Sequence, residues 1–254
     1  MKDQLSDDRS AIDEVIKLLG NERVIIGGGC ALIIYRLYLS REGPPPVATR
    51  DIDTLIRRNA SKANLHELLV AAGFKWEPKS AEPVPAECYR KRIGNKDVEL
   101  EFITNYVSHQ DHGNVKLNGI VAQQLRYLEM SLANFIEFRT DSGATGLVVS
   151  PGAWCFHKIL SFRHRKHGNL KKYKDLYGAW YVLHELGQFS EGARSELVQL
   201  MKANSSWATA AKKNVREWIA EATPKDEKML SQQDPSGTCS LDAIKKTFDP
   251  LFSA

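Results

Sequence analysis

The chain has 254 residues, of which 43% are hydrophobic and 26% are charged. This composition supports a buried core and excludes an intrinsically disordered chain, while the length allows one domain or two. The formal net charge of +4 suits a polyanionic substrate without requiring one.

The cysteines and the N-terminal segment indicate the compartment. Four cysteines are scattered along the chain without a C-x-x-C pair, which favours a reduced interior. Residues 1–10 are polar and acidic, unlike a signal peptide, and no apolar run approaches the roughly 18 residues that span a bilayer. We therefore expect a soluble, cytoplasmic protein.

The first fifty residues predict a helix, a short strand and a second helix. Apolar residues recur at helical spacing over 8–20. A β-branched run at 23–26 ends in three glycines, and residues 30–39 are apolar enough for a buried helix. Three prolines make 41–47 a loop.

A strand that carries two aspartates follows this loop. Residues 50–57 alternate, so Asp51 and Asp53 share one face of the strand and Ile52 takes the other. A helix over 61–72 and a polar stretch over 77–85 come next.

Two further strands, 88–93 and 97–104, flank Gly94-Asn95 and predict a hairpin. Its second strand carries Glu99 and Glu101. Residues 120–133 have helical character, and short strands are expected at 135–138 and 146–149.

From Ser150-Pro151 onward the pattern predicts only helices. Their expected ranges are 151–164, 170–186, 190–203 and 206–222, then an exposed linker at 223–239 and a last helix at 240–248. The predicted fold class is therefore α+β, with a mixed sheet and flanking helices in residues 1–150 and a helical bundle in residues 151–254.

The acidic pairs and the glycines have a shared chemical use. Two carboxylates at i and i+2 on a strand repel each other, and a bound Mg²⁺ or Mn²⁺ removes that penalty. A third acid from another strand completes such a site, and Gly28-Gly29 before a helix let backbone amides approach a phosphate. Taken singly, each feature is also typical of a solvent-facing strand or a tight turn.

These residues resemble the DNA polymerase beta-like nucleotidyltransferase superfamily, and within it the minimal and abortive-infection types. The matching segments are IIGGGCALIIYRL (25–37), ATRDIDTLI (48–56) and VELEFIT (98–104). The resemblance implies that Asp51 and Asp53 bind metal and that Glu101 is the third acid, with Glu99 as the alternative.

The helical part extends the resemblance. SPGAWCFHKILSFRHR and KDLYGAWYVL look like the Lys-then-Arg and Lys-Asp helices of the abortive-infection group. The sequence departs from the family at Gly178, where a second acid is usual, and at Cys30, where a small hydroxyl residue is common. The resemblance implies nucleotide contacts from Gly28, Gly29, Cys30, Arg50, Lys158, Arg163 and Asp175.

Residues 162–174 contain six lysines and arginines and no acid. Such a stretch is typical of a solvated loop between helices or of a groove for the phosphates of a nucleotide or RNA.

The resemblance implies transfer of a nucleoside monophosphate from an NTP to an acceptor, dependent on Mg²⁺ or Mn²⁺, in a cleft between the two parts. The resemblance does not identify the acceptor, and tRNA and a protein are the alternatives. With either acceptor, the chain would be a toxin or phage-defence component with an antitoxin partner. A non-catalytic nucleotide- or RNA-binding protein on the same scaffold and an unrelated α+β domain with chance acidic pairs are the competing hypotheses.

Overall fold

The structure is a computed structural model, and it describes residues 2–58, 63–79, 87–106, 113–164 and 170–253. The chain folds as two compact units. The first comprises Met1–Ile34 and Ala48–Val149, and the second comprises Tyr35–Val47 and Ser150–Ala254. The sequence predicts two consecutive segments that meet at residue 150, whereas the fold groups residues 35–47 with the second unit.

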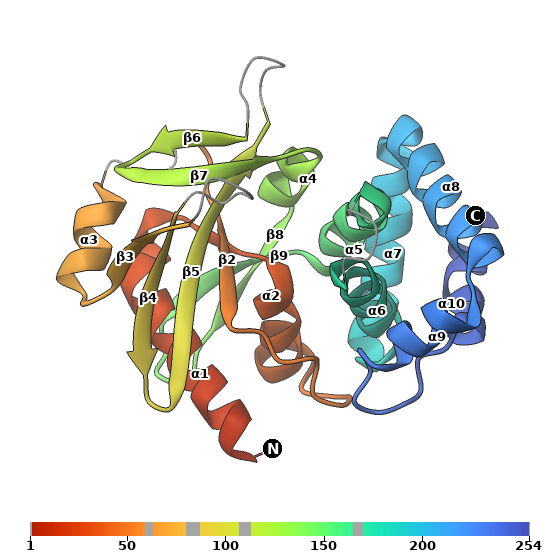
Figure 1. The fold of residues 1–254 in the computed structure, drawn as a ribbon, viewed down its shortest axis with the longest axis horizontal. Helices are drawn as coiled ribbons and strands as arrows, with labels where there is room; N and C mark the ends of the chain where they lie inside the picture. The colour runs from red at the N-terminus through yellow and green to blue at the C-terminus, as the bar shows by residue number, and fades with distance from the viewer. Residues whose placement is uncertain (1, 59–62, 80–86, 107–112, 165–169, 254) are drawn as a thin grey trace. The chain divides into compact units, whose positions relative to one another are not determined.

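The first unit is built on one nine-stranded mixed sheet, so the predicted α+β class is confirmed (Figure 1). Its strands are β1 (Ile25–Ile26), β2 (Asp51–Leu55), β3 (Lys75–Pro78), β4 (Glu87–Ile93), β5 (Lys96–Asn105), β6 (Asn114–Leu117), β7 (Ile120–Leu125), β8 (Phe135–Arg139) and β9 (Thr145–Val149).

The strand order places the two acidic strands side by side. The main path through the sheet is β3-β4-β5-β2-β1-β9-β8, while β7 pairs with β5 and with β6. Strand β2 runs parallel to β5 and antiparallel to β1. At the centre of the sheet, β1, which precedes the glycines, therefore pairs with β2, and β2 pairs with β5. Strands β2 and β5 carry the predicted acids.

The helices of this unit are α1 (Lys2–Leu19), α2 (Gly28–Ile34), α3 (Leu65–Ala71) and α4 (Leu128–Ala133), with a 3₁₀ turn η1 (Gly20–Glu22). Helix α1 packs against β4, β5 and β9 and buries Ile12, Val15 and Ile16. Ile52 and Leu100, which are register partners on β2 and β5, are also buried. Because neighbouring residues of a strand point to opposite faces, the side chains of Asp51 and Asp53 lie on the face opposite to that of Ile52.

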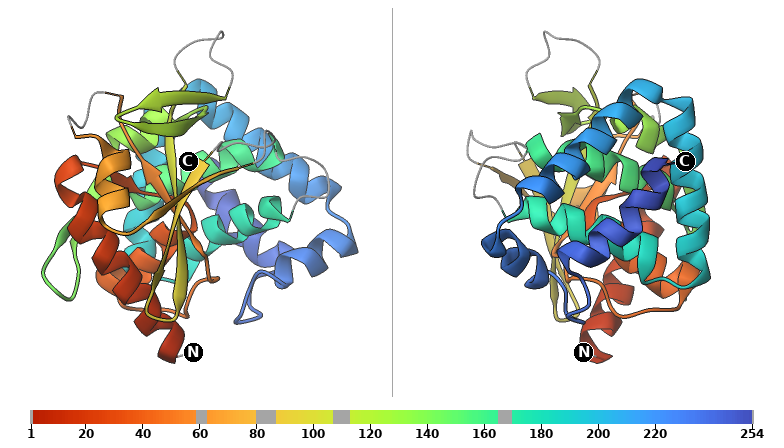
Figure 2. Two further views of the ribbon diagram at one scale, coloured as in Figure 1. Left: turned by 60° about the vertical axis from the view of Figure 1, so that its left-hand side comes forward. Right: turned by 90° about the vertical axis from the view of Figure 1, so that its right-hand side faces the viewer.

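The second unit is helical. It contains the π-helical segment η2 (Tyr35–Ser40), α5 (Pro151–Ser161), the 3₁₀ turn η3 (Phe162–His164), α6 (Lys171–His184), α7 (Gln188–Ala203), α8 (Ser205–Glu221), α9 (Pro224–Ser231) and α10 (Leu241–Ser253). Figure 2 shows the helices from α5 to α10, coloured green to dark blue, packed against one another. Helix α5 contacts α6, α7 and α8 and is the centre of this unit.

Residues 35–47 belong to the second unit because hydrogen bonds attach them to α6 and the residues after it. Ser40 Oγ donates to the carbonyl of Leu186 at 2.9 Å, and the Tyr181 hydroxyl donates to the carbonyl of Pro44 at 2.7 Å. These contacts join segments more than a hundred residues apart in the sequence, and spacing along the chain does not reveal them.

The predicted elements hold for most of the chain, with two errors and two omissions. Residues 120–133 do not form one helix, because β7 occupies the first half and only the second half, α4, is helical. Residues 223–239 are not wholly a linker, because α9 begins at Pro224. Strands β3 and β6 were not predicted. No helix in the described parts of the chain is both long and apolar enough to cross a membrane.

Candidate active site

The glycine turn after β1 lies directly against β2. Gly27 N–H donates to the carbonyl of Asp53 at 2.8 Å, and Gly28 has φ +53°. A Cβ atom at Gly28 would lie 1.5 Å from Asp53 Oδ2. Glycine is therefore required at position 28 both for its backbone conformation and for the room that the Asp53 carboxylate occupies.

The next two residues of the turn have different surroundings. A Cβ atom at Gly29 would lie 3.1 Å from Thr49 Cβ, so the start of α2 packs closely on the residues before β2. The Cys30 side chain is buried, and burial raises the pKa of its thiol to about 12. A contact between Cys30 and a ligand would therefore use the backbone rather than the thiol.

Four carboxylates gather on the central strands. Asp51 pairs in register with Glu99, and Asp53 pairs with Glu101. Register partners on adjacent parallel strands share a face and are separated by about 4.8 Å between backbones. The structure thus brings together the predicted pair and both candidates for the third acid.

Two cations that the sequence did not single out contact these acids. The Lys79 ammonium group pairs with both Glu99 and Glu101. Arg90 donates to Glu99 from Nη2 at 2.7 Å and from Nε at 2.9 Å, and its Nη1 pairs with Glu77 at 2.7 Å. Lys79 follows β3 and Arg90 lies on β4, so both side chains come from the side of β5 that is away from β2.

The two glutamates consequently differ in proton affinity. Burial raises the pKa of Glu101 to about 7; the negative charge of Asp53 adds to the rise, and Lys79 opposes it. Burial also acts to raise the pKa of Glu99, but hydrogen bonds from Lys79 and Arg90 outweigh it and lower the pKa to about 2. Glu99 is therefore a firmly ionised ion-pair partner, whereas Glu101 can exchange a proton near neutral pH.

The carboxylates supply oxygen donors of the kind that a divalent metal needs, and they lie on neighbouring strands. A cation, Lys79, already pairs with two of them. Hard oxygen donors of this kind suit Mg²⁺ and Mn²⁺. Among the described residues, however, no three His, Cys, Asp or Glu side chains already converge in a metal-binding arrangement. The ammonium group of Lys79 forms an ion pair with the carboxylate of Glu101, so a metal bound by Glu101 would have to displace this ammonium group.

Asp51 and Arg50 are the exposed members of the predicted site. Both side chains are exposed, and the Arg50 carbonyl accepts a hydrogen bond from Glu99 N–H at 3.3 Å. Asp53 is half-buried between Gly28 and the strand. Asp53, Glu99 and Glu101 are thus all more enclosed than Asp51, which faces solvent.

The remaining predicted residues belong to the helical unit, where they form ion pairs. Lys158 Nζ donates to Asp175 Oδ1 at 2.7 Å and lies 5.3 Å from the centre of the Trp154 ring. Arg163 pairs with Glu217 at 3.1 Å and Glu221 at 2.9 Å. The centre of the basic stretch, residues 165–169, lies outside the described residues.

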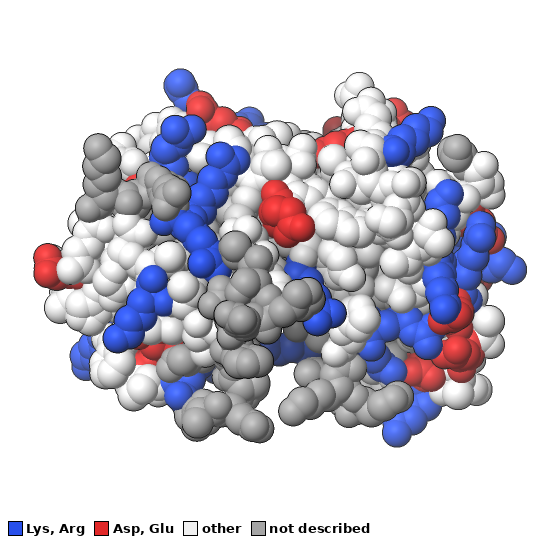
Figure 3. Space-filling model, turned by 90° about the horizontal axis from the view of Figure 1, so that it is seen from above, with Lys and Arg blue, Asp and Glu red and all other residues white. Residues whose placement is uncertain are grey.

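On the one face that Figure 3 shows, the charged side chains lie in several separate groups. Figure 3 shows lysine and arginine side chains scattered over the face seen from above, with acidic side chains in smaller groups.

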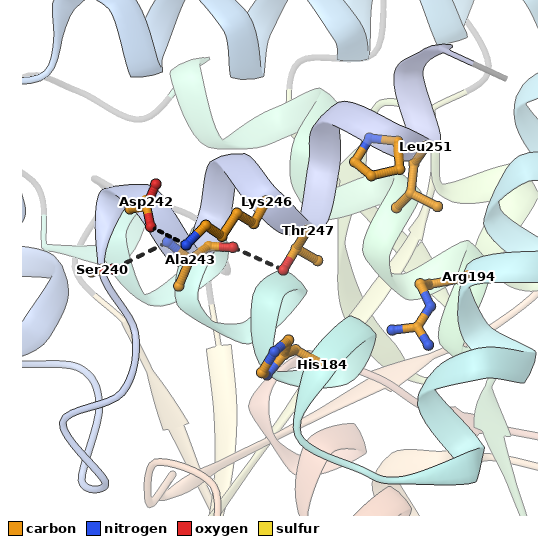
Figure 4. Close-up of a pocket in the computed structure, with 9 residues that line it drawn as sticks. His184, Arg194, Ser240, Asp242, Ala243, Lys246, Thr247 and Leu251 are labelled. Carbon is orange, nitrogen blue, oxygen red and sulfur yellow. Dashed lines mark hydrogen bonds and ion pairs between the residues drawn. The ribbon is translucent and has the colours of Figure 1, made fainter.

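Two cavities lie outside the acidic site. One, of about 420 Å³, is in the helical unit; Figure 4 shows His184, Arg194 and Thr247 around it. Arg194 Nη1 donates to the carbonyl of Leu183 at 2.6 Å, and Lys246 pairs with Asp242 at 2.7 Å. The other, of about 560 Å³, lies beside Trp76 and Glu87. Neither includes a predicted site residue.

Comparisons with known proteins identify the family of the chain. The model of a family described as nucleotidyltransferase matches residues 10–198, which is 189 of the 254 residues. This range includes the glycine turn, all four acids and Lys158. No protein among the curated sequences matches significantly.

The chain also resembles a solved structure, an antigenic nucleotidyltransferase-like protein from Paracoccidioides brasiliensis. The two are 15% identical, the similarity covers 82% of this chain and 93% of the other, and the TM-score is 0.43. Because the family model spans most of the sequence, the identification rests on that match: the chain belongs to the nucleotidyltransferase family.

Proposed function

We propose that the chain is a divalent-metal-dependent nucleotidyltransferase that moves a nucleoside monophosphate from an NTP to an acceptor and releases pyrophosphate. The observation that carries the proposal is the register of β2 and β5, which sets Asp53 beside Glu101 next to the glycine turn. The family match supports nucleotidyl transfer in general.

The acids would hold the metal. Asp51, Asp53 and Glu101 supply the oxygen ligands, with Glu99 as the alternative third acid. When bound, a divalent ion offsets the charge of the triphosphate and of the leaving pyrophosphate. Of the two glutamates, Glu101 is favoured because Glu99 is paired with Arg90 as well as Lys79.

The acceptor's nucleophilic oxygen attacks the α-phosphorus, the bond from this phosphorus to the pyrophosphate oxygen breaks, and the acceptor proton must leave. We assign that proton to a carboxylate oxygen of Glu101, the acid that lies beside Asp53 in the register of β2 and β5. Gly28, Gly29, the backbone of Cys30 and the side chain of Arg50 would contact the phosphates.

Lys158 and Arg163 are proposed to offset phosphate charge from the helical unit, with Asp175 as a polar partner. Each of these cations is already paired with acids of its own unit. A role toward phosphate therefore requires these ion pairs to open or to share the cation.

The test is Mg²⁺-dependent binding of each of the four NTPs to the full chain, measured by calorimetry. Asp53→Ala and Glu101→Gln should abolish metal-dependent binding. Asp97→Ala is the matched control, because Asp97 lies on the same strand as Glu101 but is exposed and pairs with Arg92 at 3.0 Å. If the folded parent binds no NTP, or if Asp53→Ala binds as well as the parent, the proposal is wrong.

A measurement of pyrophosphate release then distinguishes a catalytic nucleotidyltransferase from a non-catalytic nucleotide-binding protein. We propose tRNA or a protein as the acceptor and a toxin or phage-defence role with an antitoxin partner, on the resemblance to abortive-infection nucleotidyltransferases. Incubation with labelled NTP and cell extract should label one of these acceptors. Nucleotide binding without pyrophosphate release or labelling would instead favour a non-catalytic binding protein.

A further inference from the structure

We propose that Lys79 is a built-in competitor for the metal: its ammonium group pairs with Glu99 and Glu101 in the metal-free protein and must leave Glu101 when a divalent cation binds. This inference rests on the proposed metal dependence of the same site. It adds a residue that sets how tightly the site holds its metal.

The contacts of Lys79 identify it as the counter-ion of the site. Glu99 and Glu101 share one face of β5, so their charges repel each other unless a cation lies between them. The Lys79 ammonium group pairs with both. The side chains of the two acids are only 14% and 13% exposed, so water screens that repulsion weakly.

Arg90 is placed differently. Its guanidinium group pairs with Glu99 and Glu77, and no ion pair joins it to Glu101 among the residues that the structure describes. Arg90 also lies within β4, directly opposite Glu99 in the ladder. It can therefore stay in place when the metal binds, whereas the ammonium group of Lys79 competes for the same carboxylate as the metal.

The chemistry of lysine suits an exchangeable counter-ion. Its ammonium group is a compact charge on a flexible four-carbon stem, without the fixed fork of arginine. Lys79 follows the end of β3, an edge strand of the described sheet, and its side chain is 28% exposed. Releasing it moves one side chain at the margin of the sheet and leaves the β2–β5 register unchanged.

As a consequence, the site binds a divalent metal more weakly than the same acids would bind it without the Lys79 ammonium group. A cation that takes Glu101 must first break the ion pair with Lys79. Removing the ammonium group should therefore tighten metal binding, which is the opposite of the effect expected for a residue that helps to bind the metal.

Mn²⁺ binding to the full-length protein tests this, measured by calorimetry and by the electron paramagnetic resonance signal of free Mn²⁺. Lys79→Met should bind Mn²⁺ about tenfold more tightly than the parent, the change expected for one charged hydrogen bond. Its melting temperature in EDTA should fall and should rise more on adding Mn²⁺. Arg90→Met, the matched control, should change Mn²⁺ affinity much less. Equal or weaker binding by Lys79→Met would overturn the inference.

A measurement on the unmodified protein covers the case in which the variant does not fold. The ¹⁵N resonance of the Lys79 ammonium group should shift when Mg²⁺ is added. If its chemical shift does not change at saturating Mg²⁺, the inference is overturned. Asp53→Asn separates the two hypotheses. If Mn²⁺ binding does not depend on Asp53, the proposed metal site fails; if it does and Lys79→Met matches the parent, only the role of Lys79 fails.

Discussion

The carboxylate of Asp53 occupies the space that any side chain at Gly28 would need: a Cβ atom there would lie 1.5 Å from Asp53 Oδ2. The glycine turn and the acidic strand are thus one steric unit, joined further by the hydrogen bond from Gly27 N–H to the Asp53 carbonyl. The glycine that the resemblance assigns to phosphate contact also sets the position of the acid.

Gly28→Ala should therefore abolish metal-dependent NTP binding by displacing Asp53. It should also destabilise the fold by about 1–2 kcal/mol, because alanine is strained at φ +53°. Gly143→Ala separates the two effects, since Gly143 has φ +87° and no atom near its missing Cβ. Calorimetry should show normal binding for Gly143→Ala, and normal binding by Gly28→Ala would refute the steric coupling.

The stability of the metal-free protein should depend on pH through Glu101. Burial raises its pKa from 4.5 to about 7, so between these values the unfolded chain has released a proton that the folded chain keeps. Stability therefore falls as the pH rises through this window, by on the order of 2 kcal/mol, and levels off above it. The lowered pKa of Glu99 acts in the opposite direction and below this window, between about 2 and 4.5.

Urea denaturation in EDTA at about pH 5 and about pH 8 measures this contribution. Glu101→Gln cannot titrate, so the parent should lose more stability than this variant between the two conditions. Other titrating groups affect both proteins and cancel in the difference. Identical pH profiles would show that Glu101 ionises normally in the folded chain.

The sequence predicted the parts of the site that depend on local spacing. The alternation around Ile52 placed Asp51 and Asp53 on one face, and the hairpin at Gly94-Asn95 placed Glu99 and Glu101 on one strand. The two cations could not be predicted in this way. Lys79 reaches Glu101 only because β3 pairs with β4 and β4 pairs with β5, which is a property of the sheet rather than of any segment.

Some of the missed elements did have a local signal. Asn118 and Gly119 both have positive φ and join β6 to β7, as expected for an Asn-Gly hairpin. The alternation of β7 is hard to see because its buried positions include Ala122 and Gln124. Helix α9 starts with a capping box from Thr223 to Asp226, a pattern visible in the sequence.

The thiols should be unreactive in the folded protein. All four cysteines are free and buried, at positions 30, 88, 155 and 239. Burial raises the pKa of the Cys88 thiol to about 11, and the pKa of each of the other three thiols is also raised. Because the thiolate is the reactive form, Ellman's reagent should label none of them in native buffer and four in denaturant. Rapid labelling of the native chain would contradict this burial.

The ion pair between Lys158 and Asp175 should contribute to stability whatever its role toward nucleotide. Their side chains are only 14% and 8% exposed. Removing either partner of such a pair leaves a buried charge and costs about 3 kcal/mol. Lys158→Met and Asp175→Leu should each lower the free energy of unfolding by about this amount, and the double variant should lose less than the sum.

Denaturant titration of the parent, both single variants and the double variant gives the coupling energy directly. Lys172→Met is the control, because its pair with Asp226 is longer, at 3.4 Å, and more exposed. Additive losses would mean that the pair is not coupled. NTP affinity of Lys158→Met then decides the second role: a stable fold with weaker NTP binding assigns the ammonium group to phosphate, whereas unchanged binding leaves Lys158 as a structural partner of Asp175.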